Sequence, residues 1–250
     1  MDKIDAVLEK IDGYVWGIPL IVLILAVGLL LTIRTGLIQV RHLPKALRYM
    51  LKNEEGGEGD VTSFGALCTA LSATIGTGNI VGVATAIAAG GPGALFWMEI
   101  AAFLGMATKY SEGLLAVKYR EIDSDGKVLG GPFYYIEKGM GKNWKWLAVL
   151  FAIFGMLVGI LGIGTMTQIN GITAAVQNFF DPDRAMTAFS LGEYSYAWPT
   201  VISGVLVTLF AALVIIGGIK RIAKVSEIIV PFMAVVYFVC GLILIICNIT

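Results

Sequence analysis

The sequence has little charge, and the charges that it has cancel. Asp, Glu, Lys and Arg make up 14% of the 250 residues, whereas soluble domains carry about a quarter. Because 18 basic residues balance 18 acidic ones, the chain has no basic field that would attract nucleic acid. We therefore expect no nucleic-acid partner, and the shortage of charge points to a membrane protein.

The residues of a metal or catalytic centre are also scarce. Cysteine occurs three times, at Cys68, Cys240 and Cys247, each inside an apolar stretch and at no spacing typical of a metal site. The single histidine, His42, lies in a basic segment. The sequence contains no paired carboxylates at a common depth and no nucleophile motif. It therefore predicts neither an enzyme nor a protein with a bound cofactor.

Long apolar runs are what the sequence has in abundance. Runs of about 20 residues match a hydrocarbon core about 30 Å thick. Only helices and closed barrels satisfy their backbone in lipid, and these runs are too long for barrel strands. The predicted fold class is an all-α integral membrane protein with six transmembrane helices, at residues 14–33, 62–89, 94–117, 146–178, 198–218 and 227–248.

The loop charges predict the orientation of these spans. Fourteen Lys and Arg residues fall in the first, third and fifth connections, against three on the other side, namely Lys3, Lys10 and Arg184. Since basic loops stay in the cytoplasm, we expect the N-terminus outside and a multi-pass protein of the cell (plasma) membrane. The first residues are acidic rather than basic, so no cleavable signal peptide is predicted.

Three connections have patterns of their own. Residues 37–52 place apolar residues at helical spacing beside basic ones, which favours a helix in the cytoplasmic interface. Residues 130–141 are bounded by glycine and rich in aromatic residues, and we expect them to dock against the helical bundle. The run Asp181-Pro182-Asp183 predicts an external turn, with the proline able to start a following helix.

The second apolar run is interrupted near its middle by Gly76-Thr77-Gly78-Asn79. Two glycines around a β-branched residue form a continuous helix poorly. In transporters such breaks lie at the membrane midplane, where one half-helix offers N–H groups to a carboxylate and freed carbonyls hold a cation. Alternatively, Gly76, Gly78 and Gly82 form a smooth groove for close helix packing. The residues alone leave both readings open.

Polar residues in two other runs are further candidates. Gly164, Gln168 and Gly171 share one helical face, so the Gln168 amide is expected to bind either a polar substrate or a neighbouring helix. In the third run Lys109 and Glu112 are three residues apart near the cytoplasmic end, and we expect them to pair.

Three stretches together resemble the sodium:alanine symporter family, the alanine or glycine:cation symporters. They are SATIGTGNIVGVATAI at 72–87, GGPGALFWMEIAAFLGMATKYSE at 90–112 and GGPFYYIEKGMG at 130–141. The sequence departs from the family pattern at Glu99, where an aromatic residue is usual, and at Phe133, where methionine is usual. The first departure leaves the local role of Glu99 open.

The resemblance implies a LeuT-type fold, in which two inverted five-helix repeats each begin with a broken helix. Residues 62–250 would then form the first repeat, with the broken helix at 62–89. Residues 1–61 would form a peripheral span and the interfacial helix. Family members are longer, so a second repeat is expected after Thr250.

The resemblance also implies a site and a function. The N–H groups of Gly76, Thr77 and Gly78 would hold a substrate carboxylate, and Gln168 the substrate's amino group. Sodium would be held mostly by backbone carbonyls, with Ser72, Thr74, Ile75 and Asn79 as ligands. The implied function is sodium-coupled uptake of small neutral amino acids (alanine, glycine) by alternating access, with sodium as coupling ion and no other cofactor. An ion channel, or a structural subunit of a membrane complex, remains an alternative.

Overall fold

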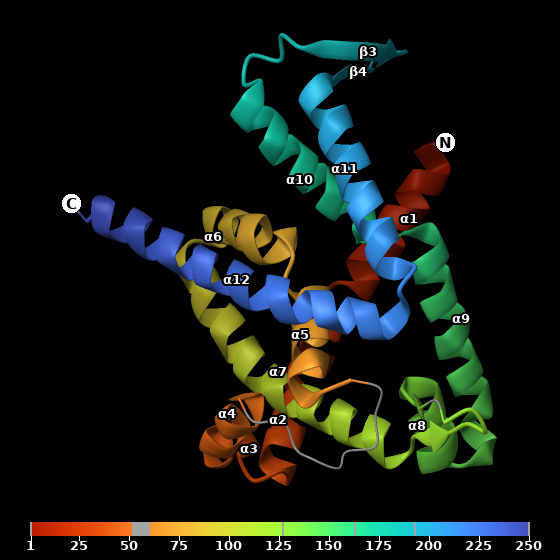
Figure 1. The fold of residues 1–250 in the computed structure, drawn as a ribbon. Coiled ribbons are helices and arrows are strands. Elements are labelled where there is room, and N and C mark those ends of the chain that lie inside the picture. Colours follow the sequence, from red (N-terminus) through yellow and green to blue (C-terminus); the bar gives the residue numbers. More distant parts are fainter. Residues whose placement is uncertain (1, 52–60, 127, 163, 193, 250) are drawn as a thin grey trace. The chain divides into compact units, whose positions relative to one another are not determined.

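The computed structural model describes residues 2–51, 61–126, 128–162, 164–192 and 194–249. Most of these residues are helical, and two short antiparallel hairpins complete the structure (Figure 1). By their internal contacts the residues form two units, one of residues 1–48 and 85–153 and one of residues 49–84 and 154–250. The predicted boundary near residue 61 separates a peripheral segment from a transport repeat. The two units are defined by their internal contacts and do not test that boundary, so it stays a prediction.

Four helical segments of the described residues are long and apolar enough to cross a membrane: Asp5–Arg34, Lys142–Phe180, Trp198–Ile215 and Gly218–Cys247. The bent pair Ser63–Thr74 and Gly78–Gly90 makes a fifth when it is counted as one span. The protein is therefore an all-α, multi-pass membrane protein, whereas the prediction of six spans is confirmed only in part. The third expected run lies within one helix, α7 (Pro92–Lys118), which contains four charged residues and is not among these candidate spans.

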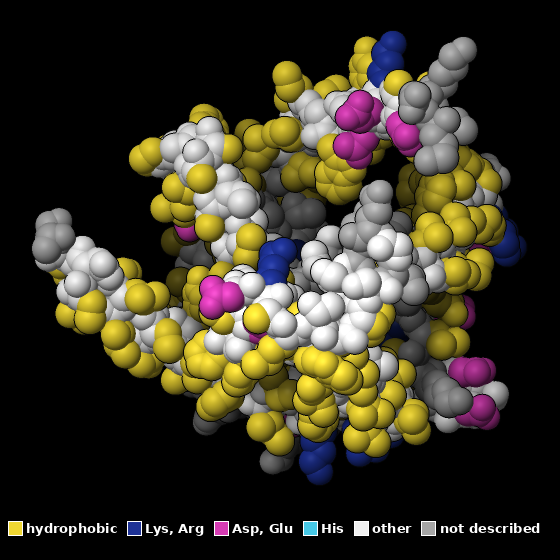
Figure 2. All heavy atoms as spheres, turned by 90° about the horizontal axis from the view of Figure 1, so that it is seen from above, with side chains coloured by type: hydrophobic (Ala, Val, Ile, Leu, Met, Phe, Trp, Pro, Cys, Tyr) yellow, Lys and Arg dark blue, Asp and Glu magenta, His cyan; other side chains and the backbone are white. Residues whose placement is uncertain are grey.

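Large apolar side chains stay exposed along the candidate spans. For example, the exposed fraction is 74% for Ile160, 66% for Phe210 and 66% for Phe238. Hydrophobic side chains also cover much of the face seen in Figure 2. In water such a surface is an aggregation liability, whereas in a bilayer it faces hydrocarbon. The surface agrees with the membrane class predicted from composition.

The first unit is built around two helices, α2 and α7. α2 (Ile18–Arg34) begins with a proline in its first turn, and α7 (Pro92–Lys118) does the same after Gly91, which has a positive φ of 67°. The two helices approach closely, since a Cβ added to Gly28 of α2 would lie 3.0 Å from Leu104 Cβ of α7. The other elements that lie wholly in this unit are α1 (Asp2–Val15), α3 (Ile38–Arg41), β1 (Glu121–Ile122), β2 (Val128–Leu129), α8 (Pro132–Met140) and η2 (Lys142–Trp144). α4 (Leu43–Leu51) belongs to it as far as Arg48.

The expected docking of residues 130–141 is confirmed within this unit. The segment forms α8, bounded by Gly131 and Gly141 with φ of 118° and 97°, and α8 packs against α7. Burial raises the pKa of the Tyr135 hydroxyl on α8, and the negative charge of Glu112 on α7 raises it further, while Lys109 lowers it. The Tyr135 hydroxyl therefore stays neutral at physiological pH.

The second unit holds two helix pairs. α5 (Ser63–Thr74) packs against α12 (Gly218–Cys247), and α10 (Thr165–Phe180) packs against α11 (Trp198–Ile215), which also touches α12. α5 and α12 bury small side chains, with Cys68 only 1% exposed and Ala223 only 4%. The π-helical turn η1 (Gly78–Gly82) follows α5 and continues into α6 (Val83–Gly90).

The fourth expected run, residues 146–178, consists of two helices rather than one. α9 (Lys145–Leu161) ends before Gly162, and α10 begins after Gly164. Both glycines have positive φ, of 62° and 88°. A left-handed glycine is the usual end of a helix, because a side chain would clash there. By length and apolarity the two helices still make one candidate span.

The turn predicted at residues 181–183 is confirmed, but a hairpin follows it in place of a helix. The buried Asp181 carboxylate accepts hydrogen bonds from the Ala185 and Met186 N–H groups, at 2.8 and 3.0 Å. The chain then forms β3 (Thr187–Leu191) and β4 (Tyr194–Ala197), which lead directly into α11. In Figure 1 this hairpin joins α10 to α11.

Candidate functional site

The helix interruption predicted at Gly76–Asn79 is present. α5 ends at Thr74, and Ile75 is extended, with φ −84° and ψ 114°. Helical structure resumes at Gly78 in the π-helical turn η1, and the helices on the two sides are bent by 60°. We call residues 75–77 the break. A π-turn directly after the break is notable, because such turns occur frequently at functional sites.

The end of α5 offers backbone carbonyls to the break. The Ile75 N–H donates to Leu71 O, so the carbonyls of Ser72, Ala73 and Thr74 lie beyond the last helical donor. The hydroxyls of Ser72 and Thr74 turn back into the helix and donate to Thr69 O and Ala70 O, each at 2.8 Å. The oxygens that face outward at this end are therefore carbonyls, the ligand type that suits a hard cation.

The second half-helix begins with a closed turn around Asn79. The Asn79 Oδ1 accepts from the Gly76 N–H at 3.0 Å, and the Asn79 N–H donates to Gly76 O at 3.0 Å. In this conformation the Asn79 side chain already engages one of the three N–H groups expected to hold a carboxylate. The N–H groups of Thr77 and Gly78 remain at the start of the half-helix, where its dipole is positive.

The break packs directly against α10. A Cβ added to Gly76 would lie 2.8 Å from both the Oε1 and the Nε2 of Gln168. One turn further along α10, a Cβ added to Gly171 would lie 2.8 Å from Thr77 Cγ2. Glycine at these positions thus lets the break and α10 touch.

The structure brings together most, but not all, of the predicted polar face. Gln168 and Gly171 both meet the break, whereas Gly164 precedes α10 as its N-cap and an added Cβ there would meet nothing within 4 Å. The Gln168 and Asn79 side chains are exposed in this chain. Both amides are therefore accessible beside the break.

α12 contributes two residues that the sequence analysis did not single out. Ser226 is buried, and its hydroxyl donates to Ser72 Oγ at 3.3 Å. Glu227 accepts a hydrogen bond from Thr62 Oγ1 at 2.7 Å, and Thr62 caps α5 by accepting from the Gly65 N–H. A carboxylate at the edge of an apolar run was an available signal, since such groups are rare in membranes and usually have a partner.

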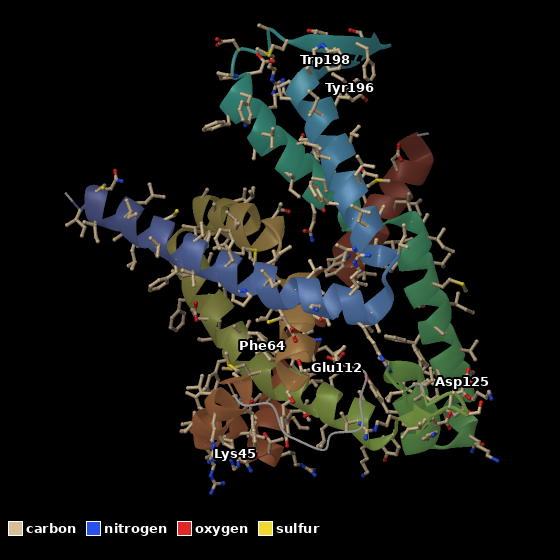
Figure 3. The ribbon with its side chains drawn as sticks, viewed as in Figure 1. Lys45, Phe64, Glu112, Asp125, Tyr196 and Trp198 are labelled. Carbon is tan, nitrogen blue, oxygen red and sulfur yellow. The ribbon has the colours of Figure 1, made fainter. Side chains whose placement is uncertain are left out.

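The ionisable pair predicted on α7 is confirmed. Lys109 Nζ lies 2.8 Å from Glu112 Oε2, and the two side chains are 78% and 43% exposed. Glu112 is labelled in Figure 3, on the half of α7 that leads to α8. The pair is thus a local i, i+3 contact on α7.

Comparison with known proteins gives a consistent result. Residues 1–250 match the family model described as the sodium:alanine symporter family. An uncharacterised transporter of Haemophilus influenzae is 53% identical over 246 residues, which cover 98% of this chain and 50% of that protein. The sodium/alanine symporter AgcS of Methanococcus maripaludis is 46% identical over 253 residues, covering 100% of this chain and 52% of AgcS.

A third relative differs in the substrate that its name gives. The probable sodium/glutamine symporter GlnT of Bacillus subtilis is 38% identical over 250 residues, covering 98% of this chain and 48% of GlnT. The chain spans about half the length of the curated relatives that it matches.

Proposed function

Because the chain belongs to the sodium:alanine symporter family, we propose that it serves in sodium-coupled uptake of small neutral amino acids, with alanine and glycine as substrates. Transport proceeds by alternating access in the cell membrane, with the N-terminus outside. The relatives' names support sodium and an amino acid as the transported pair, and they differ between alanine and glutamine.

The observation that carries this proposal is the apposition of two helix ends at the break. The carbonyl end of α5 carries partial negative charge, and the N–H end of the second half-helix carries partial positive charge. A cation is attracted to the carbonyl end and a carboxylate to the N–H end, and the two ligands also attract each other. An amino acid and sodium fit this arrangement of opposite charges.

Each predicted residue has a role in the proposed site. The Thr77 and Gly78 N–H groups bind the carboxylate, and the carbonyls of Ser72, Thr74 and Ile75 bind sodium. The Gln168 amide, exposed beside Gly76, binds the amino group of the substrate.

Asn79 links the two ligands in this scheme. Its Oδ1 is bound to the Gly76 N–H in the structure. When sodium takes Asn79 Oδ1 as a ligand, the Gly76 N–H is released and can donate to the carboxylate. Sodium thereby raises the affinity for the amino acid, and by linkage the amino acid raises the affinity for sodium by the same factor.

The test is uptake by the purified full chain in proteoliposomes. An inward sodium gradient should drive accumulation of labelled alanine or glycine, and replacing sodium with choline should abolish it. Accumulation that is equal in sodium and choline would reject the proposal. A sodium current that flows without amino acid, far above carrier turnover, would instead indicate a channel.

A further inference from the structure

A basic corner of the first unit, residues 34–48, has no part in the proposed site. We propose that this corner docks onto the headgroups of anionic phospholipids in the cytoplasmic leaflet. The inference goes beyond transport, and it requires only that the chain spans the membrane with this corner inside, as the loop charges predict.

The corner begins where α2 ends. The chain reverses at Gly36 and Leu37, both left-handed with φ of 65° and 56°, and the Leu37 N–H donates back to Thr32 O. Left-handed residues turn the chain sharply, so α3 and α4 leave the direction of α2 immediately.

The corner is anchored to the helices of its unit. Gln39 of α3 is buried, and its Nε2 donates to Thr32 Oγ1 at 2.8 Å and to Phe103 O of α7 at 3.1 Å. These bonds join α3 to both α2 and α7. The surface beyond Gln39 is therefore presented at a fixed place at the ends of these helices.

That surface is both basic and apolar. Residues 34–48 contain no Asp or Glu and four exposed cations, Arg34, Arg41, Lys45 and Arg48. On α4 the exposed Leu43 and Leu47 are spaced i, i+4 on one face, whereas Lys45 and Arg48 lie on the opposite face. Figure 3 shows the labelled Lys45 side chain extending outward from this corner.

An anionic membrane surface fits both faces at once. The face of α4 that carries Leu43 and Leu47 can enter the boundary between headgroups and acyl chains, while Lys45 and Arg48 stay among the phosphates. Leu37 and Val40, 50% and 61% exposed, extend the apolar area beside α3. Each Lys or Arg near an anionic leaflet strengthens binding by about five-fold.

The experiment measures lipid retained by the full chain in detergent. The protein is exposed to an equimolar mixture of phosphatidylglycerol and phosphatidylcholine, and bound lipids are counted by native mass spectrometry. We expect phosphatidylglycerol to be retained preferentially. The variant Arg41→Gln/Lys45→Gln/Arg48→Gln should lose this preference by about five-fold per charge removed.

A matched control separates the corner from charge in general. The variant Lys118→Gln/Lys142→Gln/Lys224→Gln removes the same charge on the same predicted side and should keep the preference. Equal loss in both triple variants, or equal retention of the two lipids by the unmodified chain, would overturn the proposal. Should the first triple variant not fold, Arg48→Gln alone still has to lower the preference about five-fold, and Arg48→Lys has to restore it.

Discussion

Gly76 and Gly78 are two residues apart, yet their surroundings differ. A side chain at Gly76 would meet the Gln168 amide at 2.8 Å, whereas an added Cβ at Gly78 would meet nothing within 4 Å. Replacing Gly76 therefore disturbs packing inside the protein, and replacing Gly78 disturbs only what approaches from outside. Gly78 is the sharper probe of a ligand.

We expect Gly78→Val to abolish uptake while leaving insertion and thermal stability nearly unchanged, because the valine fills the space that the carboxylate would occupy. The control is Gly82→Val, a substitution in the same π-turn and also with nothing within 4 Å of the added Cβ. Uptake and melting temperature are measured for both variants. Normal uptake by a well-expressed Gly78→Val protein would contradict the proposed carboxylate site.

Asn79→Ala should weaken amino-acid binding about ten-fold or more and should blunt its dependence on sodium. A hydrogen bond to a charged group contributes roughly 1.5–3 kcal/mol, and Asn79 is proposed to act toward both ligands. Binding of labelled alanine is measured over a series of sodium concentrations, with Asn170→Ala on α10 as the control. Unchanged affinity at every sodium concentration removes Asn79 from the site.

Gln168→Leu should reshape substrate selectivity while the protein stays folded, because a site that bonds a polar group rejects ligands that leave it unpaired. Gln177→Leu is the matched control, since Gln177 Oε1 accepts from Thr200 Oγ1 at 2.6 Å and joins α10 to α11. That variant should lower the melting temperature only, with an average loss of about 0.6 kcal/mol for such bonds in membranes. Competition by alanine, glycine, serine and leucine is measured beside a melting curve. If Gln168→Leu behaves like Gln177→Leu, Gln168 is structural.

Among the elements, α5 and α12 form the pair on which the break depends. Thr62 caps α5 and donates to Glu227 of α12, so one cluster fixes the start of α5. Ser226 reaches Ser72 near the other end of the same helix. The position of the α5 carbonyls at the break is therefore set in part by α12.

A double-mutant cycle tests this pairing. Thr62→Ala should destabilise the protein by about 0.5–2 kcal/mol, the usual loss of an N-cap. Combined with Glu227→Ala, the loss should be smaller than the sum of the single losses by about 0.5–3 kcal/mol, because the two residues share one hydrogen bond. Melting of the four proteins in detergent measures the coupling. Additive losses would show that the Thr62–Glu227 bond contributes nothing.

For the whole molecule, the proposed cycle moves net charge with each sodium ion, since the amino acid is a neutral zwitterion. One charge crossing 100 mV gains about 2.3 kcal/mol, so an inside-negative potential of that size should raise accumulation by up to about 50-fold. Labelled alanine uptake is compared in proteoliposomes with and without a potassium diffusion potential. Equal accumulation of alanine with and without the potential would falsify charge-carrying symport by this protein.

The sequence predicted features that depend on neighbours along the chain. The break at residues 75–77 follows from two glycines around a threonine, the turn at Asp181 from a local Asp-Pro-Asp run, and the Lys109–Glu112 pair from helical spacing. The glycines at 162 and 164 carried a similar local signal for a helix end, but in an apolar run their φ could equally have been helical. The β3–β4 hairpin was missed although the sequence carried a signal for it, since Phe189-Ser190-Leu191 and Tyr194-Ser195-Tyr196 alternate between apolar and polar residues on the two sides of Gly192.

By itself the sequence thus determined that the chain lies in a membrane, that it is helical, and where one helix breaks. These features follow because the backbone N–H and C=O groups of an apolar run in lipid must find hydrogen-bond partners within the same segment. Only the tertiary structure decided that Gln168 lies on Gly76 and that Glu227 reaches Thr62 across 165 residues. Contacts of this kind depend on which helices pack together and at what angle. In lipid the hydrophobic effect does not select which helix faces pack together, so an apolar pattern in the sequence does not reveal the helix pairs. Close packing of small residues and a few hydrogen bonds select them instead.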